Sequence, residues 1–243
     1  MQKHTDNWYT SWFDTPYYHI LYKDRDYDEA ASFMVLLTKF LELESGAKIL
    51  DLACGKGRHS KFLNKMGFNV TGVDLSPASI KYAKTFEKEN LKFEVHDMCL
   101  PFPKKFNAVF NLFTSFGYFD DENNNLRTIK SIKEELKPDG FGVIDFLNSE
   151  YLKKNLVPNE VKTVNGIDFY IERKISDGYI VKNIRFKNEN ENFFYSERVM
   201  ALALEDFKEY FSEAGVKLLH SFGDYSLNPF DEERSKRLIL IFQ

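Results

Sequence analysis

The stretch that decides the fold is KILDLACGKGRHS, residues 48–60. After Lys48 it has the apolar pair Ile49-Leu50, continues through Asp51, and reaches Gly55 and Gly57 before a segment with helical composition. Glycine suits such a turn because it accepts positive φ and lets a ligand approach the backbone. The pattern therefore predicts a buried strand, a tight turn and a helix whose first N–H groups face any ligand.

The chemistry of that ligand depends on Asp51. A dinucleotide site has the pattern G-x-G-x-x-G, whereas here Ser60 takes the place of the third glycine. A carboxylate at the strand end would repel a pyrophosphate and attract a cation such as the α-ammonium of an amino acid. Asp74 closes the next strand, where an acid can accept hydrogen bonds from ribose hydroxyls. An ammonium and a ribose together fit S-adenosylmethionine; a turn without any ligand is the open alternative.

Five segments carry a resemblance to a known family. Between about Leu43 and Asn148 the chain contains, in order, ILDLACGKG, VTGVDLS, FEVHDM, FNAVFNLFTSFGYF and LKPDGFGVIDF. In order and spacing they resemble the class I S-adenosylmethionine-dependent methyltransferases, closest in pattern to small-molecule members of the amino-sugar N,N-dimethyltransferase type. The resemblance implies an α/β fold with a Rossmann-like doubly wound seven-stranded sheet that ends in an antiparallel hairpin.

The resemblance also implies a cofactor site for S-adenosyl-L-methionine. In it, Asp97 accepts from the exocyclic amine of adenine and the backbone N–H of Met98 meets a ring nitrogen, although Asp97 is also readable as a turn-forming acid before Pro101. An N-terminal tyrosine and a basic residue approach the cofactor's carboxylate. The implied cofactor-binding residues are Asp51, Ala53, Gly55, Gly57, Asp74, Leu75, Asp97, Met98, Asn111, Phe113, Tyr17, Tyr22 and Arg25.

Residues that would meet the substrate are less sharply defined. Ser115, Tyr118 and Asn148 follow strand ends, where ligands of open α/β sheets bind. An amine nucleophile must be neutral, and a hydroxyl nucleophile needs a base within hydrogen-bond reach. His59 and Tyr118 are the candidate bases, and His59 reads equally well as a helix-surface residue. No asparagine-proline-proline-tyrosine type signature follows Phe110, which disfavours methylation of nucleic-acid bases.

Two segments embellish what we interpret as a single methyltransferase domain over residues 1–243. Residues 1–42 contain an aromatic N-terminal lid and a helix; an amphipathic helix docked on the core is the alternative. Residues 160–202 contain the hairpin-turn dipeptides Asn165-Gly166 and Asp177-Gly178, which predict an inserted antiparallel β-meander. In the family such an insertion commonly forms a substrate wall or a dimer surface, so a homodimer through the meander is expected.

Composition limits the partners. The formal net charge is −4 over 243 residues, so no global field favours nucleic acid or an anionic membrane. The two cysteines form no disulfide pattern, the histidines and cysteines form no metal-ligand cluster, and no run is long enough to span a bilayer. These features predict a cytoplasmic enzyme acting on a small molecule at N or O, without a metal. Methylation of RNA or protein, and cofactor binding without transfer, are the alternatives; a nicotinamide oxidoreductase is disfavoured by Asp51.

Overall fold

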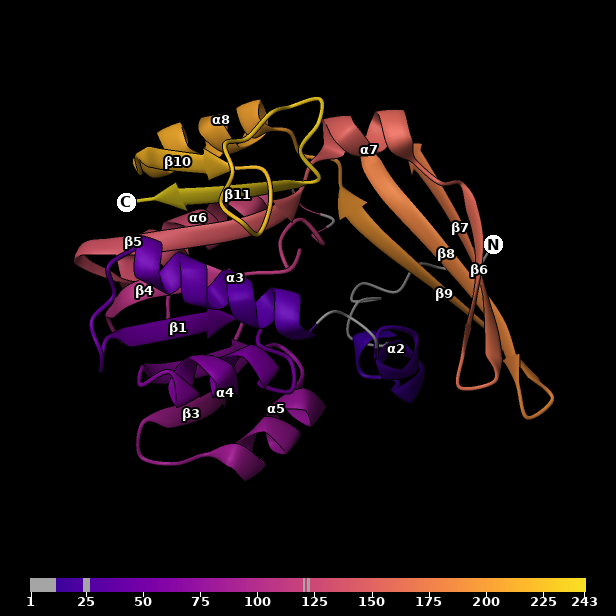
Figure 1. The fold of residues 1–243 in the computed structure, drawn as a ribbon, viewed down its shortest axis with the longest axis horizontal. Helices are drawn as coiled ribbons and strands as arrows, with labels where there is room; N and C mark the ends of the chain where they lie inside the picture. Colours follow the sequence, from indigo (N-terminus) through magenta and orange to yellow (C-terminus); the bar gives the residue numbers. More distant parts are fainter. Residues whose placement is uncertain (1–11, 24–26, 120, 122) are drawn as a thin grey trace.

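Two β-sheets organise the chain. The computed structural model describes residues 12–23, 27–119, 121 and 123–243. A seven-stranded sheet has the order β10-β11-β5-β4-β1-β2-β3, and a separate four-stranded sheet has the order β6-β7-β8-β9 (Figure 1). The predicted Rossmann-like fold class is therefore confirmed, with parallel strands in the first sheet and an antiparallel hairpin at its end.

The parallel part of the large sheet is built from five strands. They are β1 (Lys48–Leu52), β2 (Asn69–Asp74), β3 (Leu91–Val95), β4 (Phe106–Asn111) and β5 (Leu136–Leu147). Antiparallel pairing adds β11 (Arg237–Phe242) to β5 and then β10 (Leu218–Phe222) to β11. The carboxyl ends of the parallel strands all lie at the same edge of the sheet. The strand order reverses between β1 and β4, and ligands of such sheets bind at that point of the edge.

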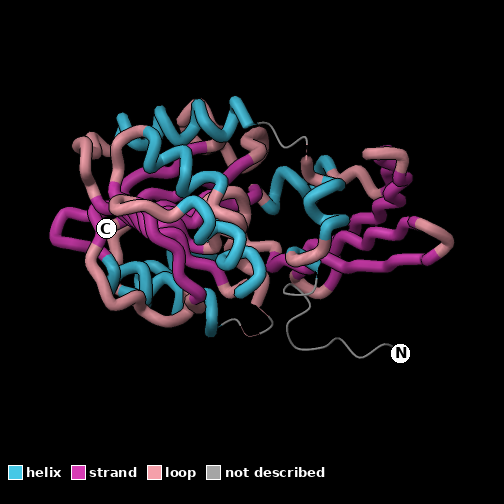
Figure 2. The backbone as a smooth tube through the Cα atoms, turned by 90° about the horizontal axis from the view of Figure 1, so that it is seen from below, coloured by secondary structure: helices cyan, strands magenta, loops and turns pink. Residues whose placement is uncertain are grey.

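Helices cover both faces of this sheet (Figure 2). One face packs against α3 (Tyr27–Phe40), α4 (Arg58–Lys65) and α5 (Pro77–Ala83), and the other against α6 (Asn123–Glu135) and α8 (Leu204–Ala214). Neighbouring residues of a strand point to opposite faces, so Ile49 joins the first core and Leu50 the second. The short helices α2 (Pro16–Leu21), α7 (Ser149–Asn155) and the 3₁₀ turn η1 (Lys84–Phe86) complete the set of described helices.

Local sequence explains how the helices behind β1 and β2 begin. The residue before α4 is Gly57, whose φ is +74°, and a Cβ there would come within 2.5 Å of the Phe93 ring. Only glycine satisfies both requirements at this position. The helix α5 begins with Ser76 as N-cap, whose side chain accepts from the N–H of Ser79, and with Pro77 in the first turn.

The second sheet is an antiparallel meander, as predicted. Its strands are β6 (Asn159–Val164), β7 (Ile167–Ser176), β8 (Tyr179–Asn188) and β9 (Glu191–Met200). The Asn165-Gly166 and Asp177-Gly178 pairs have positive φ at both positions, which matches the twist of tight hairpins. Neither β6 nor α7 was anticipated, because β6 is a largely exposed edge strand of polar composition and α7 is only seven residues long.

The segment around α2 lies between the two sheets (Figure 1). Its side chains Trp12 and Leu21 share a buried cluster with the inner face of the meander, including Phe169, Ile184 and Phe186. The carboxyl edge of the large sheet therefore faces a segment that packs against the meander on its other side.

None of the helices in the described part of the chain is long and apolar enough to cross a membrane.

Candidate functional site

A cavity of about 950 Å³ opens at the carboxyl ends of β1, β2, β3 and β4. Its inner wall comes from the turn after β1, the ends of β2 and β3, and the loop after β4. Its outer wall comes from the α2 segment, through Phe13, Asp14, Tyr18, His19 and Tyr22. The site thus lies where open α/β sheets bind their ligands, and it is covered by a segment from the start of the chain.

Asp51 is a buried acid in this wall. Its side chain is only 4% exposed, and the Ser60 hydroxyl donates to Oδ2 at 2.5 Å. Burial raises the pKa of Asp51 to about 7; the bonds from Ser60 oppose this rise and the nearby charge of Asp74 adds to it. Within the described residues no basic side chain forms an ion pair with Asp51. The cavity therefore contains a carboxyl group suited to receive a cation.

Asp74 fixes the turn after β1 to the end of β2. Its Oδ2 accepts from the N–H of Gly55 at 2.8 Å, and its Oδ1 accepts from the N–H of Ser76 at 2.8 Å. Burial raises the pKa of Asp74, and these two backbone bonds oppose the rise. A Cβ built on Gly55 would meet no atom within 4 Å, so open space lies above this turn. Both carboxylate oxygens keep lone pairs that can accept from a ligand.

The end of β3 adds a third acid. Asp97 lines the cavity together with Met98, and its Oδ1 accepts from the N–H of Cys99 at 2.9 Å. Leu75, at the end of β2, lines the same side and is 41% exposed. Three consecutive strand ends therefore present carboxylates beside apolar side chains, as a polar nucleoside with an aromatic base requires.

The loop after β4 forms the opposite side. Phe113 and Thr114 both have left-handed backbone conformations, with φ of +59° and +61°. The Phe113 ring lies 4.3 Å from the His59 ring, centroid to centroid, and Ser115 donates to the carbonyl of Leu112 at 3.0 Å. The predicted substrate residues Ser115 and Tyr118 and the candidate base His59 all line the cavity, as do Ala53 and the Phe113 side chain.

His59 has a defined tautomer in this arrangement. The Arg58 guanidinium approaches His59 Nε2 through Nη2 at 2.9 Å and through Nε at 3.3 Å. Arginine can only donate, so Nε2 must accept and the ring proton sits on Nδ1. The lone pair on Nε2 is therefore engaged by Arg58 and is not available to act as a base in this arrangement.

Four of the predicted residues lie outside the cavity wall. Gly57 packs against Phe93, and Asn111 is fully buried, with its Nδ2 3.4 Å from the carbonyl of Leu52. Asn148 is the N-cap of α7, and its Nδ2 donates to two carbonyls of the loop before β11. These three positions shape the scaffold behind the site, because each is enclosed by its own chain.

The fourth residue, Tyr17, lies on the meander instead of beside the cavity. Its ring packs 4.7 Å from both Phe186 and Phe193, and its hydroxyl accepts from Asn188 at 3.2 Å. Tyr22 does line the cavity, and its hydroxyl donates to Glu197 at 2.7 Å. Arg25 lies outside the described residues.

The α2 segment is attached on two sides. Toward the large sheet, Asp14 accepts from the hydroxyls of Ser76 and Ser79 at the start of α5. Toward the meander, Glu197 accepts from the Trp12 indole at 2.7 Å as well as from Tyr22. No described residue of the meander lines the cavity itself, so the meander shapes the site through α2. Sequence reasoning missed Asp14 and Glu197, since neither belongs to a local motif.

Comparison with known proteins agrees with this geometry. A family model described as a methyltransferase domain matches residues 49–140. The crystal structure of an S-adenosylmethionine-dependent methyltransferase from Clostridium acetobutylicum ATCC 824 superposes with a TM-score of 0.79 at 22% identity, covering 93% of this chain and 95% of that one. Residues 49–140 therefore match a methyltransferase domain, and the chain as a whole has the fold of the class I S-adenosylmethionine-dependent methyltransferases. The match spans the strand-end acids at Asp51, Asp74 and Asp97.

Three further methyltransferases extend the comparison. S-adenosylmethionine-bound CalS10 from Micromonospora echinaspora, an amino pentose methyltransferase, has a TM-score of 0.72 at 18% identity over 94% of this chain and 96% of that one. Glycine N-methyltransferase from Rattus norvegicus is 30% identical over 50% of this chain and 47% of its own length. YqeM of Bacillus subtilis (strain 168) is 36% identical over 46% of this chain. The chain thus spans about half the length of these two curated relatives, 48% for YqeM.

Proposed function

We propose that this protein transfers the methyl group of S-adenosylmethionine to a nitrogen or oxygen atom of a small molecule. The observation that carries the proposal is the buried carboxylate of Asp51, which faces the cavity and has no basic partner among the described residues. A buried anion needs a compensating cation. The α-ammonium group of the cofactor supplies one, and the acids at the next two strand ends supply acceptors for its hydroxyl and amino groups.

The residues present fit this cofactor. A volume of about 950 Å³ is at the upper end of the range for small-molecule sites, which leaves room for an acceptor beside the cofactor. Asp51 would bind the α-ammonium, Asp74 the ribose hydroxyls, and Asp97 with the Met98 backbone the adenine edge. The backbones of Ala53 and Gly55 and the side chains of Leu75, Phe113 and Tyr22 would line the remaining surface. Gly57 and Asn111 would support the residues that line the cavity without contacting the cofactor themselves.

The reaction divides between cofactor and protein. When bound, S-adenosylmethionine supplies an electrophilic methyl group on its sulfonium. The chain's own contribution is to orient the acceptor and exclude water. Phe13, Phe113 and Tyr118 line the cavity and would border the acceptor, and Tyr118 meets Phe13 edge to face at 5.5 Å between ring centroids. A neutral amine needs no base in this setting; for a hydroxyl acceptor we assign the role of base to Tyr118, which lines the cavity.

The cover over the cavity favours a small acceptor over a macromolecule. The α2 segment is bonded both to α5 and to the meander, so it narrows the approach to the strand ends. Similarity to an amino pentose methyltransferase and to a glycine N-methyltransferase favours an amine as the accepting group.

We also propose a cytoplasmic location and a homodimer that forms through the meander. The outer face of the meander exposes Val161, Tyr170 and Phe194.

Calorimetry with three ligands tests the cofactor. S-adenosylmethionine and S-adenosylhomocysteine are expected to bind, and NAD is expected to give no heat. Asp51→Asn is expected to weaken binding of S-adenosylhomocysteine by about 2 kcal/mol because it removes the charge opposite the ammonium. Asp139→Asn, at an exposed turn of β5, is the matched control. Binding of NAD without binding of the homocysteine product would sink the proposal.

A screen for acceptors then tests the transfer. Amino sugars, amino acids, small amines and phenols are incubated with the protein and S-adenosylmethionine, and S-adenosylhomocysteine release is measured. Tyr118→Phe is expected to lower turnover of a hydroxyl acceptor while leaving an amine acceptor nearly unchanged. Light scattering gives the mass of the assembly in solution and so tests the homodimer.

A further inference from the structure

One buried group of polar side chains has no part in the proposed function above, yet it touches the cavity wall. It is centred on Asp145 in β5, whose side chain is completely buried. Arg237 from β11 donates to Asp145 Oδ1 through Nε at 2.8 Å and Nη2 at 2.6 Å. Tyr225, in the connection between β10 and β11, donates to Oδ2 at 3.3 Å.

This group holds the two left-handed residues of the cavity wall. The N–H of Phe113 donates to the Asp145 carboxylate at 2.7 Å, and the N–H of Thr114 donates to the Asp145 carbonyl at 3.0 Å. Arg237 Nη2 donates to the Thr114 hydroxyl at 2.9 Å. Consecutive residues other than glycine rarely adopt positive φ unless the surroundings impose it. Here every described polar bond of the turn leads back to Asp145 or to its partner.

The Phe113 ring is held at the same time. It lies 4.3 Å from His59 on the cavity side and 5.6 Å from Tyr225 on the other, by ring centroids. Tyr225 in turn packs 4.7 Å from Phe33 of α3. The C-terminal hairpin therefore reaches the wall that borders the acceptor, through residues distant in sequence from the glycine turn.

We infer that Asp145 and Arg237 are positioning residues for methyl transfer, which set the Phe113–Thr114 turn in the shape that borders cofactor and acceptor. They touch neither ligand and act through the turn. The inference rests on the proposed function for its purpose, while the geometry of the turn can be tested without any ligand.

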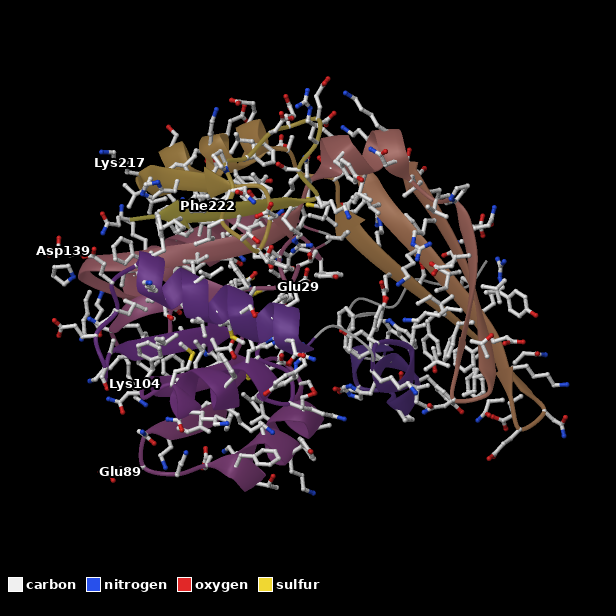
Figure 3. All side chains as sticks on the ribbon, viewed as in Figure 1. Glu29, Glu89, Lys104, Asp139, Lys217 and Phe222 are labelled. Atoms are coloured by element: carbon white, nitrogen blue, oxygen red, sulfur yellow. The ribbon has the colours of Figure 1, made fainter. Side chains whose placement is uncertain are left out.

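The first test is amide hydrogen exchange in the absence of ligand. Asp145→Asn is expected to raise exchange at Phe113 and Thr114 by about tenfold or more, with the β1 and β4 core amides unchanged. The control is Asp139→Asn at the far end of the same strand (Figure 3). If Asp145→Asn does not fold, Asp145→Asn with Arg237→Gln removes both buried charges and is used instead. Unchanged exchange in the turn would overturn the inference.

The second test asks whether the turn's shape matters for the site. Asp145→Asn is expected to weaken S-adenosylhomocysteine binding by about tenfold, and to lower kcat for any accepted substrate more than it raises KM. Adding Thr114→Gly is expected to restore binding, because glycine adopts the left-handed conformation without support. Because this glycine can also raise overall stability, thermal unfolding of both variants is measured alongside binding, at a temperature where each is fully folded.

The outcomes separate the two proposals. Raised exchange with unchanged ligand affinity and turnover, or loss of binding without rescue by Thr114→Gly, would overturn the positioning role. A wild-type protein that binds no S-adenosylhomocysteine would contradict the proposed function, and the exchange measurement would still decide whether Asp145 holds the turn.

Discussion

At the scale of single residues, Asp51 makes cofactor binding depend on pH. Its pKa of about 7 means that the carboxyl is mostly protonated below that pH, and a protonated acid does not attract an ammonium. Affinity for S-adenosylhomocysteine is therefore expected to rise about tenfold per pH unit below 7 and to level off above it. Calorimetry at a series of pH values from about 5.5 to about 8.5 measures this change in affinity. Asp51→Asn should bind weakly with a flatter profile, and a constant wild-type affinity would contradict the prediction.

A second buried acid, Glu135, affects stability instead. Its side chain is completely buried at the end of α6, where Oε1 accepts from the N–H of Phe102 at 2.8 Å. Burial raises the pKa of Glu135 to about 8 from a usual value of 4.5, although the Phe102 bond opposes the rise. The folded state thus retains a proton that the unfolded chain releases, so stability falls as pH rises between these two values.

Glu135→Gln should remove this dependence. The amide is neutral at every pH and its oxygen can still accept from Phe102, so the variant is expected to be about 2 kcal/mol more stable than wild type near pH 8. The difference in stability between the variant and wild type should shrink as the pH falls to about 5, close to the usual pKa of a glutamic acid. Urea unfolding at both pH values measures it. Glu213→Gln, on the exposed side of α8, is the control, and an equal or larger gain at the lower pH would be the wrong sign.

At the scale of elements, Glu197 of β9 fastens α2 over the cavity. It accepts from Trp12 and from Tyr22 at 2.7 Å each, and Lys182 Nζ lies 3.6 Å from its other oxygen. Glu197→Ala is expected to destabilise the docking of α2 by about 1–3 kcal/mol, since it leaves polar groups without their partner. The Trp12 emission should shift to the red in a Trp8→Phe background, and S-adenosylhomocysteine affinity should fall.

Two further variants sharpen that result. Glu197→Gln retains an oxygen that can accept from the indole, so it should restore part of the emission and of the affinity. Glu191→Ala changes an exposed acid on the same strand and should leave both unchanged. If Glu197→Ala alters neither emission nor affinity, the meander does not control the cover of the site.

The elements also show what a sequence can reveal. The positions of Asp51, Gly55 and Asp74 at the cavity were predictable because the strand, turn and helix that place them are contiguous or adjacent in one repeating pattern. The pairing of Trp12 with Glu197 joins residues 185 positions apart, and that of Asp145 with Arg237 joins residues 92 apart. Such pairs depend on how sheets and hairpins come together, and no local periodicity encodes them.

Asn148 shows how one residue can fit two local patterns. Its place just past a strand end suggested a role at the substrate, because ligands bind beyond the carboxyl ends of strands. The following residues form α7, and Asn148 caps it by accepting from the N–H groups of Glu150 and Tyr151. Asparagine at a strand end is therefore ambiguous between a ligand contact and an N-cap until the next element is known.

At the scale of the whole molecule, the cavity lies between two parts of the chain. The inner wall belongs to the large sheet, and the outer wall is the α2 segment, which packs against the meander. Figure 1 shows α2 between the two sheets. A ligand that fills the cavity contacts both walls, so its binding free energy should oppose any opening of α2 away from the sheet. Local opening and ligand binding are then thermodynamically linked.

Limited trypsin digestion tests this linkage. Lys23, exposed just after α2, is expected to be cleaved at least about tenfold more slowly when S-adenosylhomocysteine is present at about 100 times its Kd. Lys187, exposed near the β8–β9 turn, lies away from the cavity and should be cleaved at the same rate with and without ligand. Because both sites are in one chain, Lys187 corrects for inhibition of the protease. Equal slowing at both would mean that the ligand stabilises the molecule as a whole, and no slowing at Lys23 would mean that α2 does not close over the ligand.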